Sequence, residues 1–354
     1  TRLDAFKRWY AQAGTPRVTA RGRWDAPSRT YTLGLEQHCA PSPGQATKQP
    51  FVIPVAMGLV AADGRALPLQ LEGEAAPAGT ERVLVLDEAK AFYTFVGVDS
   101  EPVPSLLRGF SAPVTLTDGL NDEQLLMLLK HDEDPFNRWE AGQRLALGRL
   151  LAAARRPGDV MLDEAFIDAY AAVLRHPGLD PAFKELVLAL PSEGYVAEQM
   201  DSVDPQRVHE ARESMRAVLA QAMHGDWAAA FEANQVRGAY TRDPASMGRR
   251  ALANLALAML CLDGEARGDP AWPERALQRF RDAADMTQRF GALSALVESH
   301  SALAQTALDE FHALFRGDAL VVDKWFALQA RAPEKDGRVF ARVRQLLQHA
   351  DFSL

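Results

Sequence analysis

Residues 105–143 read SLLRGFSAPVTLTDGLNDEQLLMLLKHDEDPFNRWEAGQ, and the periodicity of the sequence changes within this stretch. Up to Asp118-Gly119, short strand-like runs are separated by joints that contain proline. After these two residues, apolar side chains recur with the 3.6-residue period of an α-helix, and this period continues toward the C-terminus. The stretch therefore predicts a border between a β region and an α region.

Residues 16–117 are predicted to form an antiparallel β-sandwich. In residues 31–36, YTLGLE, apolar side chains alternate with polar or small ones, which is typical of a half-buried strand. Asp63-Gly64 lies between two apolar runs, and both residues tolerate the positive φ of a hairpin turn. The other expected strands are residues 55–60, 67–71, 82–86, 91–96 and 105–116. About seven short strands in roughly a hundred residues indicate an immunoglobulin-like sandwich.

Residues 118–354 are predicted to form an irregular α-solenoid of antiparallel helix pairs, like armadillo or HEAT repeats. Asp-Pro pairs mark expected helix starts, because aspartate caps exposed backbone N–H groups and proline fits the first helical position. The pairs are Asp134-Pro135, Asp180-Pro181, Asp204-Pro205, Asp243-Pro244 and Asp269-Pro270. Their spacing is irregular, so the sequence contains no strict repeat. Gly225 is expected to end the helix that starts at residue 205.

The first fifteen residues are predicted to form a helix with one apolar face. Apolar or aromatic side chains recur there at helical spacing, and a Gly and a Pro that commonly end a helix follow them. These residues are Leu3, Phe6, Trp9 and Tyr10, then Gly14 and Pro16. Since the chain begins at Thr1 within this pattern, we expect it to be a piece of a longer protein.

Composition narrows the classes of partner. The net charge of −8 and the pI near 5.6 argue against a nucleic-acid partner, which would require a basic surface. No apolar run approaches the ~20 residues of a membrane span, so no membrane is expected as a partner. Cys39 and Cys261 lie in different predicted domains, so we expect free thiols and a reducing, cytoplasmic location.

Several short blocks, in this order along the chain, resemble one protein family. They are Trp9-x-x-Gln12-x-Gly14-x-Pro16, Gln49-Pro50, the run PVPSLLRGFSAPV at 102–114, DPFNRWEAGQ at 134–143, DKWF at 323–326 and LLQH at 346–349. Together they resemble the C-terminal part of the bacterial aminopeptidase N branch of the zinc-dependent gluzincin aminopeptidases. In that family further helices follow the block resembling 346–349, so the resemblance implies a solenoid that is truncated at its C-terminus.

The resemblance implies a role without catalysis in this chain. Residues 1–15 would be the tail helix of a catalytic domain upstream, residues 16–117 the sandwich, and residues 118–354 the helical domain. The whole enzyme would remove N-terminal residues from peptides with a zinc ion held by an H-E-x-x-H motif, which this sequence lacks. The partners of the chain would be its own catalytic domain and peptide substrates, and the solenoid would restrict access to the active site. A free-standing helical-repeat scaffold that binds a partner protein is the alternative.

Motifs that imitate catalytic sites are each expected to be structural. His209-Glu210-Ala211-Arg212-Glu213 starts like a zinc-binding helix, but Glu replaces the second His, and Glu213 has Arg216 or Arg212 as a neighbour. Gly109-Phe110-Ser111-Ala112-Pro113 imitates a nucleophile elbow without its last Gly, so a hydrolase that uses Ser111 is disfavoured.

The remaining candidates are histidines and carboxylates. In His131-Asp132-Glu133-Asp134, Asp134 is expected to cap a helix and the other residues to be solvated. His300 and His312 are more than three helical turns apart, so they cannot share a metal from one straight helix. The sequence therefore predicts no catalytic, cofactor-binding or metal-binding residue in this chain. The resemblance implies zinc only in the parent enzyme.

Overall fold

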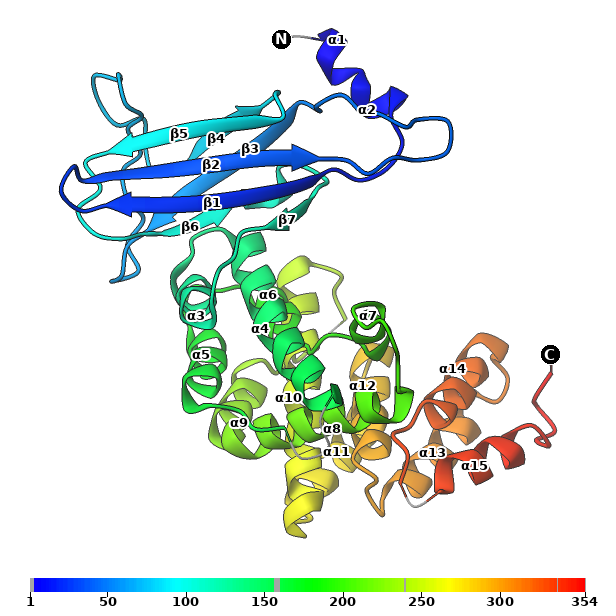
Figure 1. The fold of residues 1–354 in the computed structure, drawn as a ribbon. Helices are drawn as coiled ribbons and strands as arrows, with labels where there is room; N and C mark the ends of the chain where they lie inside the picture. Colours follow the sequence, from blue (N-terminus) through cyan, green and yellow to red (C-terminus); the bar gives the residue numbers. More distant parts are fainter. Residues whose placement is uncertain (1–2, 156–159, 239, 336, 354) are drawn as a thin grey trace. The chain divides into compact units, whose positions relative to one another are not determined.

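Two β-sheets form the centre of the first part of the chain. The computed structural model describes residues 3–155, 160–238, 240–335 and 337–353. It divides into two compact units, Thr1–Gly148 and Arg149–Leu354, each of which is described by itself. In the first unit one sheet has the strand order β5-β2-β1-β7 and the other the order β4-β3-β6, and the two sheets lie as layers in Figure 1. The strands are β1 (Arg17–Asp25), β2 (Thr30–His38), β3 (Ile53–Val60), β4 (Arg82–Leu86), β5 (Lys90–Val96), β6 (Val103–Leu106) and β7 (Thr115–Thr117).

Alternating burial along β2 places its apolar side chains in the core between the sheets. Tyr31, Leu33 and Leu35 are buried, and they belong to one cluster with residues of β3 such as Ile53 and Met57. Neighbouring strands pair antiparallel except for β1 and β7, which run parallel. The fold class predicted for this region, a β-sandwich, is confirmed.

Two of the expected strands are wrong in detail. Residues 67–71 form only isolated bridges and single hydrogen bonds, such as Leu67 N–H to the Leu59 carbonyl at 2.8 Å. Residues 105–116 are divided between β6, the 3₁₀ turn η1 (Arg108–Phe110) and β7, because Leu107 and Phe110 take positive φ values of 59° and 54°.

The predicted turn at Asp63-Gly64 is present at the end of β3. The Ala61 N–H donates to the Arg65 carbonyl at 2.9 Å, and Gly64 has a φ of +85°. A Cβ at this glycine would lie 2.5 Å from the His131 ring, so a larger residue would be strained both by conformation and by contact.

The N-terminal segment forms two short helices, α1 (Leu3–Phe6) and α2 (Arg8–Ala11), instead of one. Trp9 holds the segment on the sandwich: its indole N–H donates to the Val52 carbonyl at 2.9 Å, and its ring lies 4.6 Å from the Phe51 ring. Phe6 and Tyr10 remain exposed. The face predicted from the spacing therefore has one docked member and several exposed members.

All helices of eight or more residues in the described ranges lie beyond residue 121. They are α3 (Asp122–His131), α4 (Pro135–Arg155), α5 (Glu164–Arg175), α6 (Pro181–Leu188), α8 (Pro205–Ala222), α9 (His224–Ala233), α10 (Pro244–Arg267), α11 (Ala271–Asp282), α12 (Met286–Glu298), α13 (Ala304–Phe315), α14 (Ala319–Ala330) and α15 (Arg338–Leu346). A shorter helix, α7 (Glu193–Glu198), precedes α8. The predicted helical solenoid, described by its family model as ARM repeats, is confirmed.

The Asp-Pro pairs start helices as predicted at four of five positions. The carboxylates that accept backbone N–H groups at these starts are those of Asp134, Asp180, Asp204 and Asp243. At the fifth pair the cap is Pro270 itself, and Asp269 accepts the Ala271 N–H instead. Gly225 does not end a helix: α8 ends at Ala222, and Gly225 lies in the first turn of α9.

In the second unit, α10 is the central helix and packs against α6, α8, α9, α11 and α12. From α11 to α15 each helix packs against the next one in sequence, and α13, α14 and α15 lie together at one end of this unit (Figure 1). Sequential packing of this kind is typical of a solenoid. None of the described helices has the length and apolar character needed to cross a bilayer.

Candidate functional site

A hollow of about 1080 Å³ lies in the helical unit. Its walls come from α8, α10, α12 and α14, together with α7 and the segment after α14. Each long helix contributes one stripe of side chains three or four residues apart, because residues at this spacing lie on one helix face. The stripes are His209, Arg212, Glu213 and Arg216 on α8, Leu255, Ala258 and Met259 on α10, Phe290, Ser294 and Glu298 on α12, and Lys324, Ala327, Leu328 and Arg331 on and just after α14.

Charged side chains on α8 are tied into pairs across the hollow. Arg216 contacts Glu213 at 2.9 Å on its own helix and Glu298 of α12 at 3.1 Å. His209 lies 2.7 Å from Glu193 of α7, measured from Nδ1 to Oε1. These contacts link α8 to α7 and to α12.

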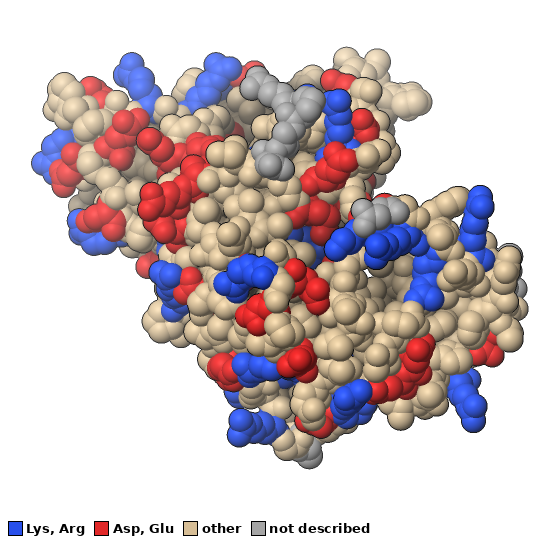
Figure 2. Space-filling view, turned by 90° about the horizontal axis from the view of Figure 1, so that it is seen from below, with Lys and Arg blue, Asp and Glu red and all other residues tan. Residues whose placement is uncertain are grey.

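Two cations, Lys324 and Arg331, line the α14 side of the hollow. Lys324 and Arg331 are exposed, and neither has an ion-pair partner among the described residues. An unpaired, hydrated cation at the rim of a hollow attracts carboxylates from solution. Figure 2 shows that Lys and Arg side chains lie interspersed with Asp and Glu over the face it presents.

The motif that imitates a zinc helix lies in this hollow, and its residues are already bonded elsewhere. His209 is paired with Glu193, while Glu213 contacts Arg216 and Arg212 as the sequence predicts. Partly exposed apolar side chains, Leu255 and Phe290, also line the hollow. This combination suits the binding of an extended, amphipathic molecule by charge and apolar contact.

Ser111 has a structural role. Its hydroxyl accepts a hydrogen bond from the Ala56 N–H at 3.0 Å, which ties the segment after η1 to β3. This agrees with the prediction that a serine at the edge of the sandwich is part of the hydrogen-bonded framework.

The prediction that the residues beside Asp134 are solvated is wrong for Asp132. Its side chain is buried and lies 3.0 Å from the buried guanidinium of Arg108. Ser105 and Asn137 extend this network, since the Ser105 hydroxyl accepts from both Arg108 and Asn137. Burial raises the pKa of the Asp132 carboxyl. Arg108 explains the difference, because a buried guanidinium requires a counter-ion and Asp132 supplies it.

His300 and His312 are not neighbours of one another on a single helix. His300 follows the end of α12 with a φ of 58°, and burial lowers its pKa. His312 lies on α13, and its Nε2 is 2.8 Å from Asp351. His349 lies beside the same Asp351 carboxylate. The spacing of His300 and His312 does not predict that His349 is a neighbour of His312.

Comparison with protein-family models identifies both regions. Residues 14–119 match a domain of unknown function with an Ig-like fold (DUF3458), and residues 122–354 match a domain of unknown function with ARM repeats (DUF3458_C). The chain belongs to this family of an Ig-like domain followed by ARM repeats.

The similar proteins are aminopeptidases. The chain is 34% identical to aminopeptidase N of Escherichia coli K12 and 39% identical to aminopeptidase N of Caulobacter vibrioides, over 99% of this chain in both cases. It spans 40% and 39% of the length of these relatives. A crystal structure of Legionella pneumophila aminopeptidase A in complex with aspartic acid matches 99% of this chain and 39% of that chain, with a TM-score of 0.78 and 26% identity. The resemblance to the C-terminal part of a bacterial aminopeptidase N is confirmed.

Proposed function

We propose that this chain is the non-catalytic C-terminal portion of a zinc aminopeptidase that removes N-terminal residues from peptides. In this proposal the catalytic portion and its zinc lie upstream, and the helical unit shapes and restricts the route of peptides to that site. The sequence contains no H-E-x-x-H motif, and the one similar stretch has its His and Glu paired with other residues. The proposal therefore assigns binding and steric selection, and no chemical step, to this chain.

The hollow of the helical unit is the main support for a role in peptide binding. Its volume of about 1080 Å³ exceeds the ~300–1,000 Å³ typical of sites for single small molecules, so it has room for several residues of a peptide. Lys324 and Arg331 would attract the carboxylates of a peptide, its C-terminus included, and the apolar atoms of Phe290 and Leu255 would contact its side chains. Folded proteins would be excluded by size.

The proposal also assigns a role to each of three segments of the chain and a cellular location to the protein. Residues 1–15 would contact the catalytic domain, residues 16–117 would space that domain from the helices, and residues 118–354 would form the selective part. Cys39 and Cys261 are both free, which supports a reducing compartment such as the cytoplasm. The two aminopeptidases align with 99% of this chain, which favours the accessory role over a free-standing scaffold.

Peptide-length selectivity tests the role of the hollow. The chain with Lys324→Ala and Arg331→Ala would be combined with a separately expressed catalytic portion, and hydrolysis of an alanyl chromogenic substrate would be compared with that of peptides of increasing length. We expect kcat/KM for acidic peptides to fall by about tenfold, roughly 1.4 kcal/mol, while hydrolysis of the short substrate is unchanged.

Arg316→Ala is the matched control, because Arg316 is an exposed arginine outside the lining of the hollow. A loss of equal size in the control, or no change in the double variant, would refute the assignment of the hollow to peptide binding.

A further inference from the structure

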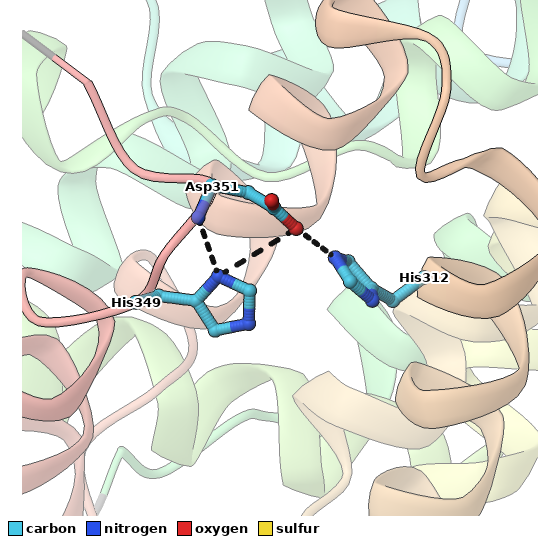
Figure 3. A group of neighbouring side chains, drawn as sticks. All are labelled: His312, His349 and Asp351. Carbon is cyan, nitrogen blue, oxygen red and sulfur yellow. Dashed lines mark hydrogen bonds and ion pairs between the residues drawn. The ribbon is translucent and has the colours of Figure 1, made fainter.

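Three side chains with metal-ligating atoms converge near the end of the described chain (Figure 3). His312 lies in the last turn of α13, whereas His349 and Asp351 follow α15. The distance from His312 Nε2 to Asp351 Oδ2 is 2.8 Å, and the distance from His349 Nδ1 to the same oxygen is 3.8 Å. One ligand atom from each residue lies within 4.8 Å of the other two.

The donor set fits a zinc ion. Imidazole nitrogen and carboxylate oxygen are common Zn²⁺ ligands at ~2.0–2.2 Å, and at that radius tetrahedral ligand atoms lie about 3.3 Å apart. The distances of 2.8 Å and 3.8 Å lie on either side of this value. His349 Nδ1 also accepts the Asp351 N–H at 3.2 Å (Figure 3), so rotating the two rings to place all three ligand atoms around one ion would replace this hydrogen bond by the bond to the ion. Three protein ligands would leave a fourth position for water.

The surroundings favour an occupied site over three separate solvated groups. The His312 and His349 rings lie 4.9 Å and 5.3 Å from the Trp325 ring, and the His349 ring is 5.5 Å from Phe326. These aromatic rings pack against the two histidines, whose side chains are 23% and 32% exposed. The Asp351 side chain is 45% exposed, so an ion can reach the carboxylate from solution.

We propose that His312, His349 and Asp351 form a binding site for Zn²⁺ or a similar divalent transition metal. The ion would replace the hydrogen bond between His312 Nε2 and Asp351 Oδ2. It would cross-link the segment after α15 to α13, across 39 residues of sequence. This site is separate from the hollow and does not rest on the proposed function.

The proposal departs from the prediction that the chain binds no metal. Spacing along one helix relates His312 only to His300, twelve residues away. His349 and Asp351 lie beside His312 only because α13, α14 and the segment after α15 pack together, which helical spacing does not show.

Titration of the 354-residue chain with Zn²⁺ against a chromophoric chelator tests the site. We expect one Zn²⁺ per chain, with affinity reduced more than about tenfold in His312→Gln and His349→Ala. His312→Gln is the decisive variant, because the amide can still donate a hydrogen bond to Asp351 but is a poor ligand for zinc. Co²⁺ should give the visible absorption of a four-coordinate ion in the wild type and lose it in these variants.

His209→Gln is the matched control, since His209 also lies 2.7 Å from a carboxylate but is not part of a three-ligand group. Its zinc binding should equal that of the wild type. Circular dichroism checks that each variant is folded, and if His349→Ala is unfolded, Asp351→Asn takes its place. Absence of saturable binding, or binding that survives in His312→Gln, would overturn the proposal.

Discussion

Asp118 ends the β region with a carboxylate that is held by Arg144 of α4. The two side chains form a bidentate pair with distances of 2.8 Å and 2.7 Å, and the Asp118 side chain is 5% exposed. Burial alone would raise the pKa of Asp118, but the hydrogen bonds and charge of Arg144 outweigh it and lower the pKa below its ordinary value. A charged pair with two parallel hydrogen bonds is among the stronger polar contacts in proteins.

Asp118→Asn should therefore lower the free energy of unfolding by about 1.5–3 kcal/mol at neutral pH. Because the folded-state pKa is depressed, this stabilisation is present above the unfolded pKa and is lost as the pH falls through the folded pKa. Urea unfolding across the acidic range should show the wild-type and variant values converging at low pH. Asp99→Asn, which affects an exposed pair with Arg29, should change stability by less than about 1 kcal/mol. A difference that persists at low pH would contradict the assignment.

The buried pair of Asp132 and Arg108 predicts a larger effect. Asp132→Ala would leave the Arg108 guanidinium buried without its buried counter-ion, which costs about 3–5 kcal/mol. Replacing both residues by apolar ones of similar volume, Arg108→Met with Asp132→Leu, should cost less than the single change. Chemical denaturation of the single and double variants checks this order. Equal losses would show that Ser105 and Asn137, and not the charge pair, hold this network together.

At the scale of elements, Trp9 of α2 packs on the sandwich, and Arg8 and Gln12 beside it donate hydrogen bonds to the Pro50 and Gln49 carbonyls. Trp9→Ala removes the ring contact with Phe51 and the hydrogen bond to Val52, so docking should weaken by roughly 1.5–3 kcal/mol. Tryptic cleavage after Lys7 and Arg8 should become at least about tenfold faster, since 1.36 kcal/mol is a factor of ten. Tyr10→Ala is the control, because Tyr10 is 84% exposed and its loss should leave cleavage unchanged. Equal rates in all three proteins would show that Trp9 does not hold the segment.

Elements whose start or end has a local chemical cause could be predicted from the sequence. Asp204-Pro205 starts α8 because a carboxylate cap and a proline act within one turn. Gly225 does not predict the end of α8, because α9 begins at His224 and this glycine lies in its first turn. Segment 67–71, expected to be a strand from its apolar pattern, forms only isolated bridges and single hydrogen bonds.

At the scale of the whole molecule, sites made by distant elements escape sequence reasoning. The stripe of His209, Arg212, Glu213 and Arg216 can be recognised as one helix face from its spacing alone. This face and the α14 stripe line the same hollow because of the way the helices pack. The irregular spacing of the helix starts does not predict that packing. The convergence of His312 and His349 has the same origin, since one histidine is helical and the other follows the last described helix.

The proposed accessory role predicts that the chain alone is inactive and that its N-terminal face binds the catalytic portion. Leu3 and Phe6 are 64% and 44% exposed, and burying such side chains contributes at most roughly 1.5–3 kcal/mol each. We expect the chain to show no hydrolysis of an alanyl chromogenic substrate, and to associate with a separately expressed catalytic portion. Leu3→Ala with Phe6→Ala should weaken that association by about tenfold or more in analytical ultracentrifugation, since 1.4 kcal/mol is a factor of ten. Leu314→Ala, an equally exposed apolar residue of α13, should leave it unchanged. Hydrolysis by the isolated chain that survives metal chelation would sink the accessory role and require an active site within these residues.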